Sequence, residues 1–223
     1  MGYRYRDFED YTKKFDCWYV KYAFAYLSEV YTVKRLLPKD DFGLEIGVGT
    51  GRFASALGIP LGIDPSKQSL KIAHQRGIEV ILAVGEKLPF KDKIFSYVLM
   101  VVVLSFLLNP LQSLKEVYRV LKDGGRVVIG IIDRESFLGR IYQERKEKGY
   151  PFYREANFFT PKEVVEMLTR LGFKDFEILQ TVSKPIESME NIEHPVEGYG
   201  KGGFVVISAK KVKSIDGKNI VDS

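Results

Sequence analysis

The sequence predicts an α/β fold, with a mostly parallel seven-stranded sheet, helices on both faces and an antiparallel last strand. Three observations support this fold class. Apolar strand-like runs alternate with helix-like segments from about residue 42 to 180. The first of these runs enters a glycine-rich turn, and one more apolar run follows a long connection near the end of the chain. We therefore expect a single domain over residues 1–211, followed by a polar tail over 212–223.

The first predicted strand, over residues 42–46, ends in a segment with the pattern E-x-G-x-G-x-G. Glycine has no Cβ, so backbone N–H groups in such a turn can approach a ligand closely. A dinucleotide-binding turn has the pattern G-x-G-x-x-G, and its third glycine would fall where this chain has Arg52. That mismatch argues against a nicotinamide-dependent oxidoreductase. A helix is expected to begin at Arg52 and continue to Leu57.

The second predicted strand, Ile59–Ile63, ends at Asp64. The separation from Gly47 is close to the ~20 residues at which nucleotide-binding α/β folds place a ribose-binding acid. A carboxylate suits this role because it can accept two hydroxyl hydrogen bonds at once. The alternative is a plain turn aspartate before Pro65.

The next elements are a capped helix and two strands. Ser66 is expected to cap a helix that ends before Gly77, and a strand covers residues 79–84. The apolar run Phe95–Leu108 is too short for a membrane span of ~20 residues. Its β-branched cluster Val101–Val103 favours a buried central strand.

The second half of the chain repeats the alternation. Asn109 and Pro110 have the signature of a helix start, and a strand is expected over residues 127–132. Thr160 and Glu163 form a capping-box pattern for a helix that runs to residue 171. The last two strands are predicted over 173–179 and 204–209.

The motifs together resemble those of class I S-adenosylmethionine (SAM)-dependent methyltransferases. The glycine-rich segment resembles their motif I, and G-E-K-L-P-F at residues 85–90 resembles a segment of the ubiquinone/menaquinone-biosynthesis-like methyltransferases of type 11. The resemblance covers roughly residues 28–211 and implies a Rossmann-like fold and methyl transfer from SAM, giving S-adenosylhomocysteine, without a metal. The cofactor-binding residues it implies are Glu45, Gly47, Gly49, Gly51, Asp64, Gly85, Glu86 and Val103.

One position departs from the family pattern. Val84 and Gly85 stand where the family has Asp and Ala, and that Asp usually meets the adenine amino group. Adenine recognition is therefore expected to rely on backbone groups, or on packing against Leu88 or Ile81.

A substrate should bind outside the carboxyl ends of the parallel strands, where the turn after motif I and residues 105–109, 133–159 and 180–202 emerge. Aromatic residues gather in the N-terminal segment and in the insertion over 134–159. They predict a helical lid over residues 1–27 with an apolar pocket, although helical spacing is also typical of packing residues. The predicted substrate-binding residues are Tyr19, Tyr22, Phe106 and Tyr153.

Methyl transfer requires mainly alignment and desolvation, and a general base only where the acceptor carries a proton. The two catalytic candidates are Tyr19 and His194, with a solvated loop position as the alternative for this histidine. His74 is expected on the surface, and no metal-ligand pattern is present in the sequence.

Composition limits the remaining possibilities. The net charge is +5, but Lys and Arg alternate with Glu, so the acceptor is expected to be a small molecule and not nucleic acid. Cys17 is the single cysteine, which excludes an intramolecular disulfide. We expect a cytoplasmic monomer or homodimer without signal peptide or membrane segment, and a composition rich in Lys, Glu and Arg is typical of thermophiles. An RNA or protein methyltransferase and a non-catalytic SAM-binding protein remain open as alternatives.

Overall fold

The computed structural model describes Thr12, residues 16–39 and residues 42–212. Residues 16–21 are helical. The strands are β1 (Gly43–Ile46), β2 (Leu61–Asp64), β3 (Glu79–Leu82), β4 (Phe95–Val101), β5 (Leu121–Ile132), β6 (Phe173–Thr181), β7 (Val196–Glu197) and β8 (Phe204–Lys211). The helices are α2 (Ala23–Leu36), α3 (Arg52–Leu57), α4 (Lys67–Gln75), η2 (Val103–Phe106), α5 (Pro110–Val120), α6 (Phe137–Glu147), α7 (Pro161–Arg170) and η3 (Ile186–Ser188).

The strands form one sheet in the order β3-β2-β1-β4-β5-β8-β6-β7. The neighbours from β3 to β5 pair in parallel, and β8 runs antiparallel between β5 and β6. The predicted mostly parallel sheet with an antiparallel last strand is confirmed. The two-residue β7 adds an eighth strand to the seven predicted, at the edge beside β6.

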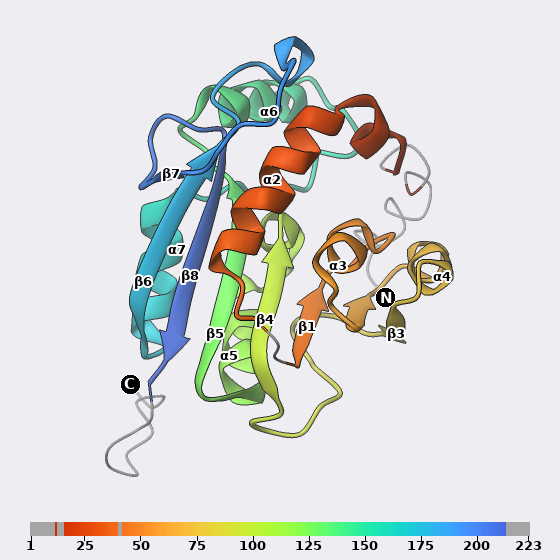
Figure 1. Cartoon of the computed structure of the whole chain (residues 1–223), viewed down its shortest axis with the longest axis vertical. Helices are drawn as coiled ribbons and strands as arrows, with labels where there is room; N and C mark the ends of the chain where they lie inside the picture. Colours follow the sequence, from red (N-terminus) through yellow and green to blue (C-terminus); the bar gives the residue numbers. More distant parts are fainter. Residues whose placement is uncertain (1–11, 13–15, 40–41, 213–223) are drawn as a thin grey trace.

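Helices cover both faces of the sheet (Figure 1). Strand β4 illustrates how the sequence divides the core, because alternate side chains of a strand point to opposite faces. Leu99 joins the cluster beneath α2, α3 and α4, whereas Val98 and Met100 join the cluster that includes residues of α5 and α7. Each face is therefore apolar, as a sheet buried on both sides requires.

Side-chain caps fix the starts of three predicted helices. Ser66 Oγ accepts a hydrogen bond from Ser69 N at 3.2 Å, and Asn109 Oδ1 accepts one from Gln112 N at 3.0 Å. The capping box at Thr160 and Glu163 is complete. These caps satisfy backbone donors that the first helical turn leaves unpaired, and they confirm the predicted starts.

The prediction of a strand through Val101–Val103 was wrong at its end. Strand β4 ends at Val101, Val102 turns with φ +59°, and η2 begins at Val103. A β-branched residue rarely adopts positive φ, and such strain collects at functional sites. The hydrogen bond from Val102 N to Gly130 O, 2.7 Å, holds the turn against β5. The apolar composition alone gave no sign of this turn.

Strand β5 also begins earlier than predicted. Leu121 pairs with Phe95, after which the register shifts until Arg126 pairs with Tyr97. Gly124, with φ +83°, lies within this irregular segment and supplies a conformation that other residues rarely adopt. In the described part of the chain, no helix is long and apolar enough to cross a membrane.

Candidate functional site

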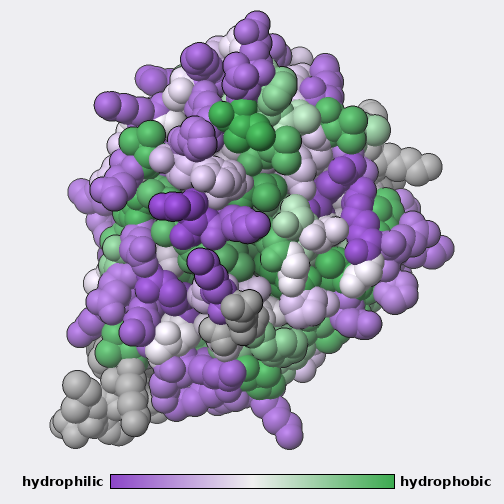
Figure 2. Space-filling model, viewed as in Figure 1, coloured by the Kyte–Doolittle hydropathy of each residue, from purple (hydrophilic) through white to green (hydrophobic). Residues whose placement is uncertain are grey.

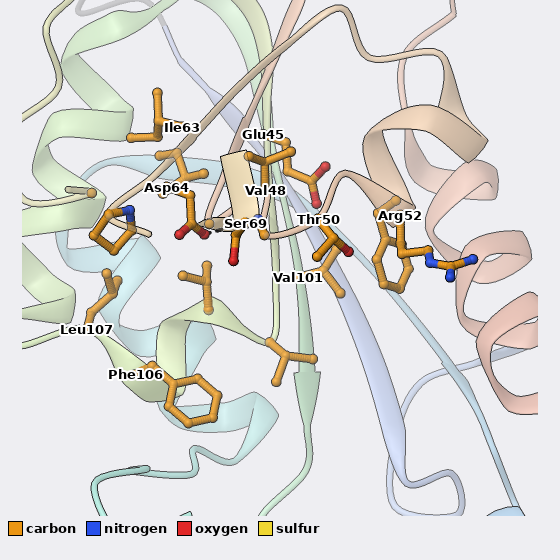
Figure 3. A pocket seen from close by; sticks show the side chains of 18 of the residues that line it. Glu45, Val48, Thr50, Arg52, Ile63, Asp64, Ser69, Val101, Phe106 and Leu107 are labelled. Atoms are coloured by element: carbon orange, nitrogen blue, oxygen red, sulfur yellow. Dashed lines mark hydrogen bonds between the residues drawn. The ribbon is translucent and has the colours of Figure 1, made fainter. Parts of the chain in front are cut away.

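A cavity of about 160 Å³ lies where β1, β2 and β4 end. Its walls come from the turn after β1, Asp64, residues 83–85 and the segment from Val101 to Leu107. Figure 3 shows Asp64 and Glu45 on one side of this cavity and Phe106, on η2, on the other. The site is therefore at the carboxyl edge of the parallel strands, as the topology predicts.

Asp64 is held rigidly at the end of β2. Its Oδ2 accepts a hydrogen bond from Gly49 N at 3.0 Å, and its Oδ1 accepts one from Ser66 N at 2.8 Å. Burial raises the pKa of Asp64 to about 6, while these two bonds lower it. Each carboxylate oxygen keeps further lone-pair capacity for a ligand hydroxyl in the cavity.

Glu45 is a buried carboxyl on β1, with 2% of its surface exposed. Burial raises its pKa well above the usual value, and a hydrogen bond from the Ala54 backbone opposes that rise. Its Oε2 has no hydrogen-bond partner among the described residues. An unpaired buried carboxylate oxygen costs free energy unless a ligand supplies a donor.

The three positions of motif I need glycine for different structural reasons. At Gly47, with φ +71°, a Cβ would clash with the side chain of Val103, so only a glycine allows the turn to pack this closely against η2. At Gly49, with φ +52°, a Cβ would meet nothing within 4 Å. Gly51 begins α3 in the left-handed conformation and faces the backbone of Ala73 in α4. Gly47 and Gly49 line the cavity, whereas Gly51 serves helix packing.

The segment that resembles the family's adenine region lies partly in the wall. Ala83, Val84 and Gly85 line the cavity, but Glu86 does not. Glu86 Oε1 instead accepts hydrogen bonds from Leu108 N and Asn109 N, at 2.9 and 3.2 Å, so it fixes the loop after η2. Of the predicted packing partners, Leu88 belongs to the core cluster on the α5 side and Ile81 packs against that cluster, and neither lines the cavity.

A second cavity, of about 200 Å³, adjoins the first. The two share five wall residues: Tyr19, Phe53, Val102, Phe106 and Phe152. The remaining lining residues of the second cavity are Trp18, Glu29, Ile132, Tyr142, Tyr153 and Phe158. Eight of the eleven residues that line the second cavity have aromatic rings. We call it the aromatic cavity.

The helical segment 16–21 is anchored over both cavities through Asp16. Asp16 Oδ1 accepts hydrogen bonds from Thr50 Oγ1 at 2.7 Å and from Arg52 Nε at 2.9 Å, and Oδ2 accepts one from Arg76 Nη2 at 2.9 Å. Burial raises the pKa of Asp16, but its bonds to Arg52 and Arg76 outweigh this effect and place the pKa well below the usual range. Sequence reasoning missed this anchor, although Asp16 stands within the F-D-x-W pattern of the N-terminal segment.

The structure brings most of the predicted substrate residues together. Tyr19 and Phe106 line both cavities, and Tyr153 lines the aromatic cavity. Tyr22 lines neither cavity and packs against Trp18, with ring centroids 5.5 Å apart. The residues that sequence reasoning did not name as binding residues include Trp18, Glu29, Phe53 and Tyr142.

The structure does not bring His194 to either cavity. The connection 180–202 was expected on the substrate side, but Glu193 N bonds Ser28 Oγ on α2 at 2.8 Å and holds it away. His194 is exposed and packs edge-on against Tyr31, which lies with Phe24 and Leu27 among the exposed apolar residues of α2. Figure 2 shows hydrophobic side chains among hydrophilic ones on the face that α2 covers.

His74 is exposed on α4, as expected, and Cys17 is an exposed free thiol. Among the residues that the structure describes, no group of three or more His, Cys, Asp or Glu side chains could hold a metal ion. The side chains that line the two cavities include carboxyls, hydroxyls, aromatic rings and the guanidinium of Arg52.

Comparison with known proteins gives consistent matches. A family model described as a methyltransferase domain matches residues 44–129. An uncharacterized protein of Methanocaldococcus jannaschii is 51% identical over 205 residues, covering 92% of this chain and 98% of that protein. That relative comes from a thermophile, in agreement with the composition. A demethylmenaquinone methyltransferase of Oceanobacillus iheyensis is 25% identical over 197 residues, or 80% of this chain and 76% of that protein.

Among solved structures, a Thermotoga maritima SAM-dependent methyltransferase, described as a possible histamine N-methyltransferase, shares 44% sequence identity. The match covers 94% of this chain and 100% of that chain, with a TM-score of 0.91. Sequence motifs, fold and these relatives agree, and the chain belongs to the SAM-dependent methyltransferases of the methyltransferase-domain family.

Proposed function

We propose that this methyltransferase transfers the methyl group of SAM to a small-molecule acceptor that binds in the aromatic cavity. The observation that carries this proposal is the shared wall of the two cavities. A donor in the first cavity and an acceptor in the second would meet at Tyr19, Val102 and Phe106. Such an arrangement suits a reaction in which alignment of two bound molecules supplies much of the rate enhancement.

The residues of the first cavity fit the cofactor. Asp64 has free acceptor capacity for the two ribose hydroxyls, and the unpaired Oε2 of Glu45 suits a cationic amino group. The open space at Gly49 lets the cofactor lie close to the backbone. Adenine recognition would rely on backbone groups of residues 83–85 and on contact with Leu107.

Bound SAM supplies an activated methyl group on a sulfonium, and S-adenosylhomocysteine is the product left behind. The protein has to orient the acceptor and exclude water from the reacting atoms. Phe106, Phe53 and Phe152 contribute to the apolar wall between the cavities and fit the exclusion of water. We propose that the reaction uses no metal.

We further propose that the N-terminal segment, residues 1–27, acts as a lid and that residues 134–159 form a substrate-side insertion. Within the described residues, Trp18 and Tyr19 contribute to the wall of the aromatic cavity, and Asp16 ties their helix to the motif I turn. Tyr142, Phe152 and Tyr153 contribute to the same wall from the insertion.

Calorimetry and a methyl-acceptor screen test the proposal. We expect SAM and S-adenosylhomocysteine to bind at roughly micromolar affinity, about −8 kcal/mol, and NAD not to bind. Methyl-labelled SAM incubated with panels of small molecules, RNA and protein should label a small molecule. Labelling of RNA or protein alone would contradict the proposed acceptor class, and cofactor binding without any transfer would favour a non-catalytic SAM-binding protein.

A further inference from the structure

We propose that the acceptor is an amine, and that Glu29 on α2 binds its nitrogen inside the aromatic cavity. This inference rests on the proposed methyl transfer and names the acceptor class for the same site.

Glu29 is an unusual residue for the position it occupies. It has 4% of its surface exposed, and its helix neighbours Ala25, Val30 and Val33 belong to the apolar core. In the described part of the structure, no hydrogen bond or ion pair opposes the effect of burial, which raises its pKa to about 8. Glutamate is almost never fully buried unless it is paired. A purely structural role at this position would favour an apolar side chain, so we infer that the carboxyl binds a ligand.

The walls around Glu29 favour a cation. The aromatic cavity presents rings from several elements, and Glu29 contributes the single acidic or basic side chain among its described lining residues. A protonated amine is attracted to the faces of Trp and Tyr rings and forms strong hydrogen bonds with a carboxylate. A carboxylate or phosphate group on the acceptor would be repelled by the ionised form of the same side chain.

Other titratable groups near Glu29 lie on α2 itself and on the elements packed against it. The hydroxyls of Tyr19, Tyr26 and Tyr142 have raised pKa values because of burial, so they stay neutral at physiological pH. Tyr153 interacts with Arg145, whose guanidinium lies 5.4 Å from the ring centroid of Tyr142 and outside the cavity lining.

Two further carboxyls are close enough to Tyr19 to raise its pKa, namely Asp16 and Glu45. Asp16 is engaged by Arg52 and Arg76, and Glu45 lines the cofactor cavity. Glu29 does not line the cofactor cavity. It is therefore the carboxyl available to an acceptor in the second chamber, whereas Glu45 is the one available to the cofactor.

The proposed reaction balances with these groups alone. An ammonium entering the cavity gives one proton to the Glu29 carboxylate and becomes a neutral amine. The nitrogen lone pair then forms the new N–C bond while the S–C bond of the methyl donor breaks and its electron pair stays on sulfur. The methylated ammonium and the thioether are the products, and the proton on Glu29 leaves to solvent.

Binding of matched probes tests Glu29 directly. The full chain, saturated with S-adenosylhomocysteine, would be titrated with phenethylamine and with phenethyl alcohol, and with further primary amines paired with their alcohols. A hydrogen bond to a charged group predicts at least a ~10-fold preference for the amine in the wild type. In Glu29→Gln that preference should disappear, while the affinity for S-adenosylhomocysteine stays within about 2-fold.

Turnover with methyl-labelled SAM separates the test of methyl transfer from the test of Glu29. Glu29→Gln should lower kcat/KM for amines and remove the dependence of the rate on the ionisation of this carboxyl. Thermal unfolding controls for folding, because replacing an unpaired buried carboxyl should raise Tm at pH 9. Absence of SAM binding would overturn the proposed function. Normal SAM binding with no amine in the panel preferred over its alcohol, or with amine methylation unaffected in Glu29→Gln, would overturn the role of Glu29 alone.

Discussion

Removal of the Asp64 carboxylate should weaken cofactor binding and change its pH dependence. The two carboxylate oxygens are fixed by Gly49 N and Ser66 N, at 3.0 and 2.8 Å, so they are already oriented for two ribose hydroxyls. Hydrogen bonds to a charged group contribute about 1.5–3 kcal/mol. Asp64→Ala should therefore raise the Kd for S-adenosylhomocysteine by roughly 10- to 150-fold.

The pKa of Asp64, about 6, fixes the expected pH range. Bound hydroxyls favour the ionised carboxylate, so binding must release a proton wherever the free protein carries one. The contribution of Asp64 to the affinity should be constant above about pH 7 and fall by up to tenfold per pH unit below about pH 6. Asp64→Asn should flatten that fall, because the amide does not titrate.

Isothermal titration calorimetry between pH 5 and 8 measures both effects, with buffers of different ionisation enthalpy to count protons. Glu45→Gln is the companion variant, since Glu45 is the second buried carboxyl of the cavity and its pKa is also raised. It should weaken binding as well, but the fall in affinity below about pH 6 should remain, because Asp64 is still present. Equal affinity in wild type and Asp64→Ala would refute the ribose role and leave Asp64 as a turn residue. An unchanged pH profile in Asp64→Asn would assign the titration to another group.

Four other predictions follow from the same structure. Gly49→Ala and Gly58→Ala each place a Cβ at positive φ with nothing within 4 Å, so each should lower the free energy of unfolding by about 1 kcal/mol. Only Gly49→Ala should weaken cofactor binding measured by calorimetry, because Gly49 lines the cavity and Gly58 does not. Glu45→Gln should raise Tm at pH 8, because the raised pKa of Glu45 makes its ionisation destabilising at high pH. The same variant should weaken S-adenosylhomocysteine binding, and a lower Tm would contradict the stability argument. Asp16→Asn should lower the free energy of unfolding by about 1–3 kcal/mol at pH 7. Because the pKa of Asp16 is lowered in the folded protein, the difference between wild type and variant should be full above about pH 4 and shrink progressively as the pH falls further, which acid titrations of stability measure. Tyr19→Ala should reduce kcat/KM at least tenfold on an identified acceptor while Tyr22→Ala should not, because only Tyr19 lines the cavities; equal effects would favour a general packing role for the N-terminal aromatics.

The fold was predictable because local and global signals agree. Ser66, Asn109 and Thr160 cap helices as their sequence context indicates, and the glycine turn after β1 is followed at the expected separation by Asp64. The ends of elements at the site were less predictable. Val102 adopts a strained turn inside an apolar run, and that choice depends on the hydrogen bond to Gly130, far away in sequence.

The cofactor side of the site was easier to predict than the acceptor side. Asp64 and the glycines lie within one short segment whose spacing determines their geometry. The aromatic cavity instead collects residues from the helix at 16–21, α2, α3, η2, β5, α6 and the segment after it. Glu29 lies in a helix that mixes apolar and polar residues, so its sequence context does not indicate whether it faces solvent, and only tertiary packing shows that it is buried. The position of His194 could not be predicted, because the topology determines the edge of the sheet at which a loop emerges but not the direction in which the loop then folds.

A crystal structure with S-adenosylhomocysteine bound would test the proposed arrangement of cofactor and acceptor in the two cavities. We predict that the ribose hydroxyls contact the Asp64 carboxylate, that the amino group contacts Glu45, and that the sulfur faces the aromatic cavity containing Glu29. A ligand bound elsewhere, or one whose sulfur faces away from the wall formed by Tyr19 and Phe106, would contradict it.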